Sequence, residues 1–191
     1  MPRQPIAAIT RLIGAGTGDL MLGLLREIAA AAGPGAAAID SEAVLHRFAL
    51  HYAATAGTAC RAYPGATRAL ERLRSAGLRL ACVTNKEERY SRSVLAACAM
   101  QGEFDLLIGG DTLAVKKPDG RVLAHVIARL GGARAGTAHV GDSRSDIEAA
   151  RNAGVAAWAV PYGYNRGEPI ANAHPDRLFR DLGEVADHVL G

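Results

Sequence analysis

Residues 138–154, AHVGDSRSDIEAARNAG, carry the clearest fold signal in the sequence. It begins with a short apolar run, passes through Gly141 and Asp142, and continues as an alanine-rich segment with helical spacing. This order predicts a strand, a tight loop and a helix. Because ligands of an open parallel sheet bind at the carboxyl ends of its strands, we expect Asp142 to lie at a ligand-binding edge.

Two aspartates stand four residues apart at the start of this predicted helix. The spacing places Asp146 one helical turn beyond Asp142, so both carboxylates can reach the same place. Mg²⁺ needs few protein carboxylates because it keeps several waters and phosphate oxygens. The pair is therefore a candidate metal site. The alternative is structural, with Asp142 or Ser143 capping the helix and Asp146 supporting its dipole.

Helical and apolar segments alternate from residue 59 onward. Apolar runs predict strands at residues 78–84, 104–108, 138–140 and 158–161, and helical patterns cover residues 64–75, 87–99, 119–130 and 182–190. The run LRLACVT at residues 78–84 is apolar on both faces, which is typical of a parallel sheet covered by helices on each side. The pattern predicts a doubly wound α/β domain.

The first 57 residues are helical in pattern and carry no catalytic constellation. Helices are expected over residues 19–32 and 40–55, with Asp19 and Asp40 as N-caps and Gly33-Pro34-Gly35 between them. We expect residues 1–57 to form a partial helical cap and residues 58–191 to form the α/β core. The loop at residues 14–17, GAGT, is either a flexible turn or an approach to an anion at the helix start.

Polar side chains follow two further predicted elements. Thr84 and Asn85 come directly after a strand, and a hydroxyl with an amide makes an uncharged cradle for phosphate oxygens. Lys117, between Lys116 and Pro118, offers a compact cation for phosphate. The alternatives are an ordinary turn at Asn85 and a solvated lysine pair.

Taken together, GDSxxDxxAAxxAG, Thr84-Asn85 and Lys117-Pro118 resemble the motifs of the haloacid dehalogenase (HAD) superfamily, in its phosphoglycolate phosphatase-like branch. The resemblance implies a Rossmannoid doubly wound parallel sheet. It also implies that Asp142 binds Mg²⁺, that Asp146 supports or shares the ion, and that Thr84 and Asn85 bind the phosphoryl group. Lys117 is the implied catalytic lysine, which holds charge between nucleophile and phosphate. Where the family often has a second proline, this chain has Gly120.

One family motif is missing. The family's nucleophilic aspartate belongs to a DxDGT-like motif that ends its first, central strand, and this chain has no Asp-x-Asp anywhere. We therefore expect the sheet to lack its first central strand, which leaves the strands that end at Thr84 and Val140 unpaired on one side. The apolar residues 5–10, PIAAIT, offer a filler without a carboxylate. We expect a truncated chain that turns over poorly or not at all.

The resemblance implies a Mg²⁺-dependent phosphatase that hydrolyses a small phosphate monoester, with 2-phosphoglycolate as the first choice, through an aspartyl-phosphate. A related sugar-phosphate phosphatase, mutase or pyrophosphatase is an alternative within the superfamily. A second alternative is a non-catalytic remnant that binds phosphate or Mg²⁺. The expected partner is a small phosphorylated metabolite.

Composition narrows the classes of partner and compartment. The net charge of +3 is mild and scattered, so we expect no nucleic-acid partner. No apolar stretch reaches the ~20 residues of a membrane span. Cys60, Cys82 and Cys98 are odd in number and lack metal-ligand spacing, which suits reduced thiols in a cytosol. We expect a cytoplasmic monomer or homodimer.

Overall fold

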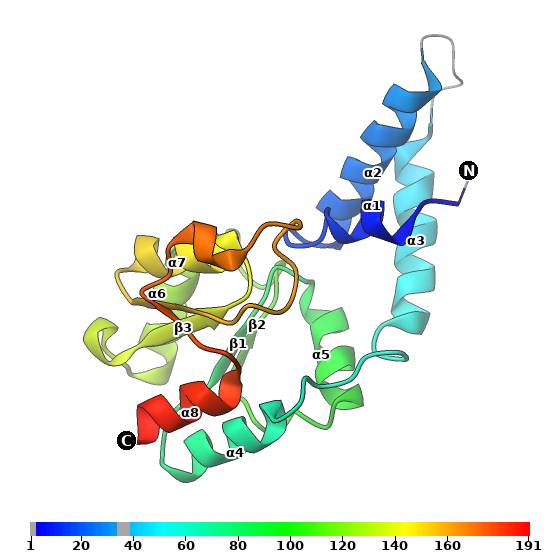
Figure 1. The fold of residues 1–191 in the computed structure, drawn as a ribbon. Coiled ribbons are helices and arrows are strands. Elements are labelled where there is room, and N and C mark those ends of the chain that lie inside the picture. Colours follow the sequence, from blue (N-terminus) through cyan, green and yellow to red (C-terminus); the bar gives the residue numbers. More distant parts are fainter. Residues whose placement is uncertain (1–2, 34–38) are drawn as a thin grey trace.

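The computed structural model describes residues 3–33 and 39–191, and the predicted Pro34-Gly35 turn lies outside them. Three helices form a lobe that extends from the rest of the chain (Figure 1): α1 (Ile6–Thr10), α2 (Thr17–Ala32) and α3 (Ser41–Thr55). Helices α2 and α3 pack side by side as a hairpin, and α1 lies against α2. No helix in the described part of the chain is long and apolar enough to cross a membrane.

The helix caps of this lobe confirm one prediction and correct another. Asp40 is the N-cap of α3, and its side chain accepts a hydrogen bond of 3.0 Å from Ala43 N. Asp19 is not a cap, because α2 begins at Thr17 with Gly16 as its N-cap. Asp19 instead supplies an acidic side chain in the first turn, where a negative charge stabilises the helix dipole.

The remaining chain alternates between helices and parallel strands, as the sequence predicts. Its elements are α4 (Ala66–Ser75), β1 (Ala81–Val83), α5 (Glu88–Ala97), β2 (Leu106–Ile108), α6 (Arg121–Leu130), a 3₁₀ turn η1 (Arg134–Gly136), β3 (Ala138–Gly141), α7 (Arg144–Ala153), β4 (Ala156–Ala159), a second 3₁₀ turn η2 (Ile170–Ala173), β5 (Arg177–Leu178) and α8 (Leu182–Leu190).

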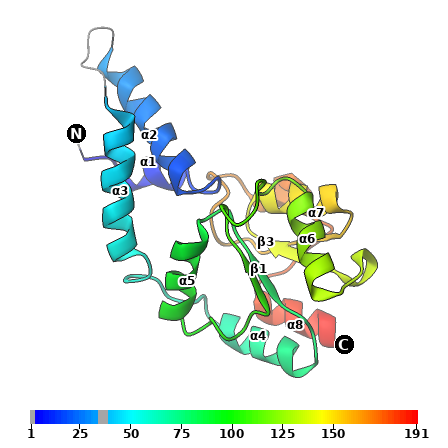
Figure 2. The same cartoon turned by 180° about the vertical axis from the view of Figure 1, so that it is seen from behind.

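The helices cover both faces of the strands (Figures 1 and 2). On one face, α6 and α7 pack together and bury Leu123 and Ile147 in the main apolar cluster. On the other face, α4 and α8 pack through Ala69, Leu73 and Ala186. The prediction of a doubly wound parallel α/β fold is confirmed.

The strands form two separate parallel sheets instead of one. One sheet has the order β1-β2, and the other has the order β3-β4-β5. The register pairs Val83 with Ile108 in the first sheet, and Val140 with Trp158 in the second. Strands β1 and β3 are thus edge strands that face one another across a gap, where the resemblance placed a missing central strand.

Several element bounds differ from the sequence prediction. Residues 5–10 do not fill the gap, because Ile6–Thr10 is helix α1 of the lobe. Helix α4 begins at Ala66 instead of Pro64, since Gly65 adopts a left-handed φ of 76° at its N-cap. Strand β4 begins at Ala156 and ends before Pro161. The two-residue strand β5 was not predicted, because one arginine followed by one leucine is too short to show a strand pattern.

Candidate active site

A buried ion pair lies at the carboxyl ends of β1 and β3. Lys117 Nζ lies 2.6 Å from Asp146 Oδ1, and the two side chains are only 9% and 6% exposed. The same ammonium donates a hydrogen bond of 2.6 Å to the carbonyl oxygen of Val83, the last residue of β1. Lys117 therefore ties β1 to the first turn of α7. The predicted site residues Lys117 and Asp146 are in direct contact, whereas the alternative of a solvated lysine pair is wrong for Lys117.

The Asp146 carboxylate has partners on both oxygens. Besides Lys117, Oδ1 lies 3.1 Å from His139 Nε2. Oδ2 accepts hydrogen bonds from Ser143 N at 3.0 Å and Ser143 Oγ at 2.5 Å, in a capping box at the start of α7. Although burial alone would raise the pKa of Asp146, the Lys117 ammonium and the His139 hydrogen bond hold it well below its ordinary value. Asp146 is thus an ionised anchor that orients Lys117.

His139 is a site residue that the sequence reasoning missed. Because a carboxylate only accepts hydrogen bonds, the Nε2 atom that faces Asp146 carries the proton. Burial lowers the pKa of His139, and the Lys117 ammonium adds to this effect, although the hydrogen bond to Asp146 acts in the opposite direction. The imidazole is therefore neutral. The sequence signal was the alternation of side chains in β3, which puts His139 and Gly141 on one face. In the structure this face meets Asp146, because a Cβ on Gly141 would lie 2.2 Å from Asp146 Cβ.

Asp142 follows β3 directly and is held by the loop after β4. Tyr164 N donates a hydrogen bond of 2.8 Å to Asp142 Oδ2. Gly163, with φ of +125°, permits this approach because a Cβ there would lie 1.8 Å from the same oxygen. Burial raises the pKa of Asp142, with the Tyr164 hydrogen bond acting in the opposite direction. A cation beside this carboxylate would relieve the cost of its burial.

These donors fit Mg²⁺ only in part. Asp142 offers carboxylate oxygen, the ligand chemistry that Mg²⁺ prefers, while both oxygens of Asp146 are already engaged. Within residues 3–33 and 39–191, no group of three or more His, Cys, Asp or Glu side chains could hold a metal ion. The described residues thus supply one available carboxylate, and a complete site needs oxygen ligands from water, substrate or a further segment.

Thr84 and Asn85 lie at the end of β1, as predicted. Thr84 Oγ1 accepts a hydrogen bond of 3.1 Å from Lys86 N, so it shapes the turn and keeps its own proton available. The Asn85 side-chain amide donates to Lys117 O at 2.9 Å and to Gly14 O at 3.0 Å, and its Oδ1 is buried without a partner in the described structure. Asn85 therefore joins residues 116–120, the lysine loop, to the lobe.

The loop at residues 14–17 closes against this edge. Lys116 Nζ donates to Ala15 O at 2.7 Å and pairs with Asp19 Oδ2 at 2.5 Å. Thr17 Oγ1 donates a hydrogen bond of 2.5 Å to Glu87 Oε1. Since a Cβ on Gly16 would lie 2.9 Å from a backbone oxygen of the core, the two lie in tight contact. The loop is a docked segment of the lobe.

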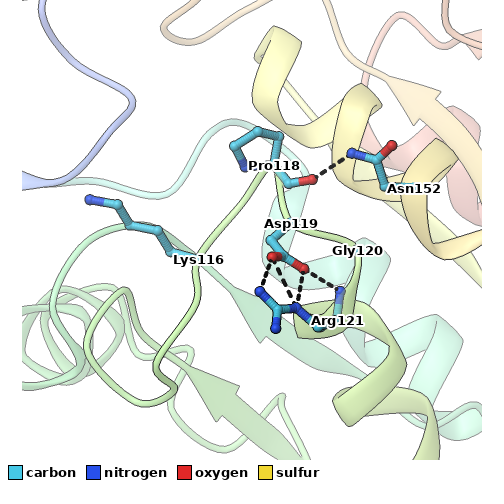
Figure 3. A pocket seen from close by; sticks show the side chains of 6 residues that line it. All are labelled: Lys116, Pro118, Asp119, Gly120, Arg121 and Asn152. Carbon is cyan, nitrogen blue, oxygen red and sulfur yellow. Dashed lines mark hydrogen bonds and ion pairs between the residues drawn. The ribbon is translucent and has the colours of Figure 1, made fainter.

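Figure 3 shows the contact between Asn152 of α7 and Pro118 of the lysine loop. Asn152 Nδ2 donates a hydrogen bond of 2.9 Å to Pro118 O, in an open hollow of about 470 Å³. A Cβ on Gly120 would lie 2.4 Å from the Asn152 carbonyl carbon. Gly120 thus allows the loop to lie directly on α7, a packing reason that the sequence alone did not indicate. In the same hollow, hydrogen bonds from Arg121 lower the pKa of Asp119 to about 2.

A smaller cavity lies between the loop at residues 14–17, the lysine loop and the start of α7. Its volume is about 350 Å³, which is the size of a pocket for a small molecule. Asn85 and Lys117 line it from the core, Gly14 and Ala15 line it from the lobe, and Arg144 lines it from α7. The Arg144 guanidinium makes no hydrogen bond or ion pair within the described residues, so this cavity has cationic groups available for an anion.

A larger apolar cavity separates the two sheets. It has a volume of about 690 Å³ and runs between β1 and β3, under α6 and over α8. Most of its lining side chains are apolar, namely Leu73, Leu78, Leu80, Val83, Val126, Ile127, Leu130, Val140, Trp158, Val185 and Val189. At the site end, His139 lines it. The cavity is therefore an apolar slot that reaches Val83 and His139, both of which contact the ion pair.

Alternate residues of β1 point their backbone N–H and C=O groups towards this slot. Leu80 O accepts and Thr84 N donates hydrogen bonds on the β2 side. Because successive residues of a strand present their backbone groups to opposite sides, Ala81 and Val83 face the slot. In the described structure, Lys117 satisfies Val83 O, and no hydrogen bond outside the regular elements involves the N–H of Ala81 or Val83.

Alternate residues of β3 point their backbone groups towards the slot from its opposite side. Thr137 O and Gly141 O both accept hydrogen bonds on the β4 side. By the same alternation, Ala138 and Val140 present their backbone groups to the slot. Among the described residues, β1 and β3 thus each lack a neighbouring strand on the side that faces the slot.

Comparison with known proteins identifies the family. The family profile of haloacid dehalogenase-like hydrolases matches residues 2–154. The chain belongs to this family. A phosphoglycolate phosphatase of Mannheimia succiniciproducens is 34% identical over 186 residues, which cover 97% of this chain and 83% of that protein. The crystal structure described as a predicted phosphoglycolate phosphatase from Haemophilus somnus has a TM-score of 0.92 and 28% identity, and covers 99% of this chain and 84% of that one.

Other relatives match over shorter stretches. A phosphoglycolate phosphatase of Thiobacillus denitrificans is 37% identical over 136 residues, 71% of this chain and 60% of that protein. The match to the one from Pseudomonas syringae covers 64% of this chain and 45% of that protein. The chain thus spans between about half and three-fifths of the length of these curated relatives.

Proposed function

We propose that this HAD-family chain is the lobe and core of a Mg²⁺-dependent phosphatase that hydrolyses a small phosphate monoester, with 2-phosphoglycolate as the first substrate to test. The observation that carries the proposal is the buried contact between Lys117 and Asp146 at the end of an apolar slot between β1 and β3. A buried lysine on an ionised carboxylate is a fixed positive charge, as a transferring phosphoryl group requires.

We assign a separate role in phosphate binding, Mg²⁺ binding or positioning to each residue at the strand ends. Lys117 keeps one N–H free of Asp146 and Val83 and can donate it to a phosphate oxygen. Thr84 keeps a hydroxyl proton for the same group, and Asn85 holds the lysine loop in register. Asp142 would hold Mg²⁺, which when bound adds charge neutralisation for the phosphoryl oxygens. Asp146 positions Lys117.

The lobe at residues 1–57 is proposed to act as the cap over the core at residues 58–191. The docked loop at residues 14–17 supports this role, because it closes the cavity that Lys117 and Arg144 line. A cap that excludes water strengthens every charge interaction beneath it. We infer a small phosphorylated metabolite as substrate. The free thiols of Cys60, Cys82 and Cys98 support a reducing, cytoplasmic compartment.

The proposed reaction uses an aspartate nucleophile from an Asp-x-Asp motif, and these 191 residues contain no Asp-x-Asp. We propose that a strand ending in Asp-x-Asp occupies the slot between β1 and β3 in the active protein. One carboxylate would attack phosphorus, and the second would protonate the leaving alcohol and then activate water. The free edges of both strands support this arrangement. The 191-residue chain alone is expected to be inactive.

The test is Mg²⁺-dependent phosphate release from 2-phosphoglycolate. Three proteins are compared: the 191-residue chain, the same chain with an N-terminal apolar strand ending in Asp-x-Asp, and a matched extension ending in Asn-x-Asn. Only the Asp-x-Asp form should turn over, with a rate at least about 10⁴-fold above the other two. Asp142→Asn in that form should lower the rate by about 10² or more.

Two results would contradict the proposal. Turnover by the unextended chain that depends on Asp142 would mean that another residue supplies the nucleophile. A folded Asp-x-Asp form that binds inorganic phosphate or Mg²⁺ without turnover would favour a non-catalytic binding domain. If the extended form hydrolyses a sugar phosphate or pyrophosphate faster than 2-phosphoglycolate, the reaction class holds and the substrate is corrected.

A further inference from the structure

Two cysteines from distant parts of the chain lie in contact beside the joint between lobe and core. Cys98 Sγ lies 3.5 Å from Cys60 Sγ, although the residues are 38 positions apart. Cys60 lies in the segment that links α3 to α4, and Cys98 is the C-cap of α5. Both thiols are free and half-buried. Neither belongs to the candidate active site.

The linker is pressed tightly onto α5 at this point. Cys60 Sγ donates to Gly57 O at 3.1 Å and also lies 3.8 Å from Val94 O on α5. A Cβ on Gly57, whose φ is +92°, would lie 2.8 Å from Ser93 O. The two sulfurs are therefore held near each other by backbone packing and not only by side-chain choice. A disulfide needs an S–S distance of about 2.05 Å, so the sulfurs must approach by roughly 1.5 Å.

We propose that Cys60 and Cys98 form an oxidation site in which a hydroperoxide converts the two thiols into a reversible intramolecular disulfide. The disulfide would fasten the linker, and with it the lobe, to α5. This inference does not depend on the proposed phosphatase activity.

The chemistry balances with hydrogen peroxide as the oxidant. The Cys60 thiolate attacks one peroxide oxygen, the O–O bond breaks, and water leaves after protonation, which gives a sulfenic acid. The Cys98 thiolate then attacks that sulfur, the S–S bond forms, the S–O bond breaks, and a second water leaves. Two thiols are oxidised by two electrons, and one peroxide is reduced to two waters.

The contact also assigns the order of the two steps. Burial raises the pKa of Cys98, and its hydrogen bond to Cys60 raises it further. Cys98 is therefore the thiol that holds its proton more strongly, and it donates its hydrogen bond to the Cys60 sulfur. We accordingly assign Cys60 as the sulfur that meets peroxide and Cys98 as the resolving thiol. Cys82 lies in β1 with no thiol partner among the described residues, which makes it a matched control.

The experiment treats the purified chain with a small excess of hydrogen peroxide and counts thiols after denaturation. We expect the count to fall from three to one, a Cys60–Cys98 linked peptide in the digest, and full recovery with dithiothreitol. Cys82→Ser should still lose two thiols, whereas Cys60→Ser and Cys98→Ser should form no intramolecular link. Amide exchange at Gly57 and Thr58 should slow on oxidation in the Cys82→Ser protein and not in Cys98→Ser.

Three outcomes would overturn the proposal. One is retention of all three thiols under conditions that oxidise free cysteine. Another is a disulfide that joins Cys82 or two separate chains. The third is a Cys60–Cys98 link that leaves amide exchange in the linker unchanged, which would remove the fastening role.

Discussion

Lys117 Nζ lies 2.6 Å from Asp146 Oδ1 inside the core, whereas the adjacent Lys116 reaches the lobe and pairs with Asp19 on the surface. Two neighbouring lysines thus serve different parts of the molecule. The first orders the site, and the second fastens the lobe. The difference in burial, 9% against 41% side-chain exposure, predicts that their removal has unequal costs.

Lys117→Met leaves the Asp146 carboxylate buried without its cation. Because breaking one half of a buried pair leaves an uncompensated charge, we expect a loss of about 3–5 kcal/mol in the free energy of unfolding. Lys116→Met removes only an exposed pair and should cost about 1 kcal/mol or less. Urea denaturation followed by circular dichroism measures both. Equal losses would mean that the Lys117 pair is not buried as described.

Gly120→Ala tests the packing of the lysine loop on α7. The added methyl would lie 2.4 Å from the Asn152 carbonyl carbon, so the loop must move away. We expect a loss of about 1–3 kcal/mol in the free energy of unfolding. Gly102→Ala is the control, because a Cβ there meets nothing within 4 Å. An unchanged midpoint for Gly120→Ala would show that the loop does not lie on α7.

Asn85→Ala tests the clamp between lobe and core. The substitution leaves the carbonyl groups of Lys117 and Gly14 without their donor. The expected loss in the free energy of unfolding is about 1–3 kcal/mol. Asn172→Ala, which removes a single exposed bond of 3.3 Å to Glu168, should change it little. Proteolysis within residues 14–17 should also become faster in Asn85→Ala only.

The titration of Asp119 tests the structure of the lysine loop. Its pKa is about 2 because Arg121 donates hydrogen bonds to it. A depressed carboxyl pKa means that the pair stabilises the fold above the unfolded value near 3.9 and loses that effect as the pH falls towards about 2. Carboxyl-carbon NMR should follow this titration, and Arg121→Ala should raise the pKa of Asp119, since only the backbone N–H at position 121 would still donate to it. A titration near 3.9 in the unaltered chain would contradict the contact.

The sequence predicted the α/β order and the residues that gather at the strand ends, because period and turn chemistry are local properties. Its errors concern packing. Aspartate is a favoured N-cap residue, which led to the prediction for Asp19. Helix α2 begins earlier, with Gly16 as its N-cap in close contact with the core. His139 was not predicted as a site residue, because it comes into contact with Asp146 only when α7 folds back on β3. The predicted roles towards ligands stay predictions for all five site residues, Thr84, Asn85, Lys117, Asp142 and Asp146.

We propose that the slot between β1 and β3 seats an acidic strand in the active protein. Amide hydrogen exchange at Ala81, Val83, Ala138 and Val140, measured by NMR, gives the decisive test. These N–H groups should exchange rapidly in the 191-residue chain and become protected by at least about 10²-fold in the form extended with Asp-x-Asp, because each then gains a ladder hydrogen bond. Rapid exchange that persists in a catalytically active extended form would contradict the claim.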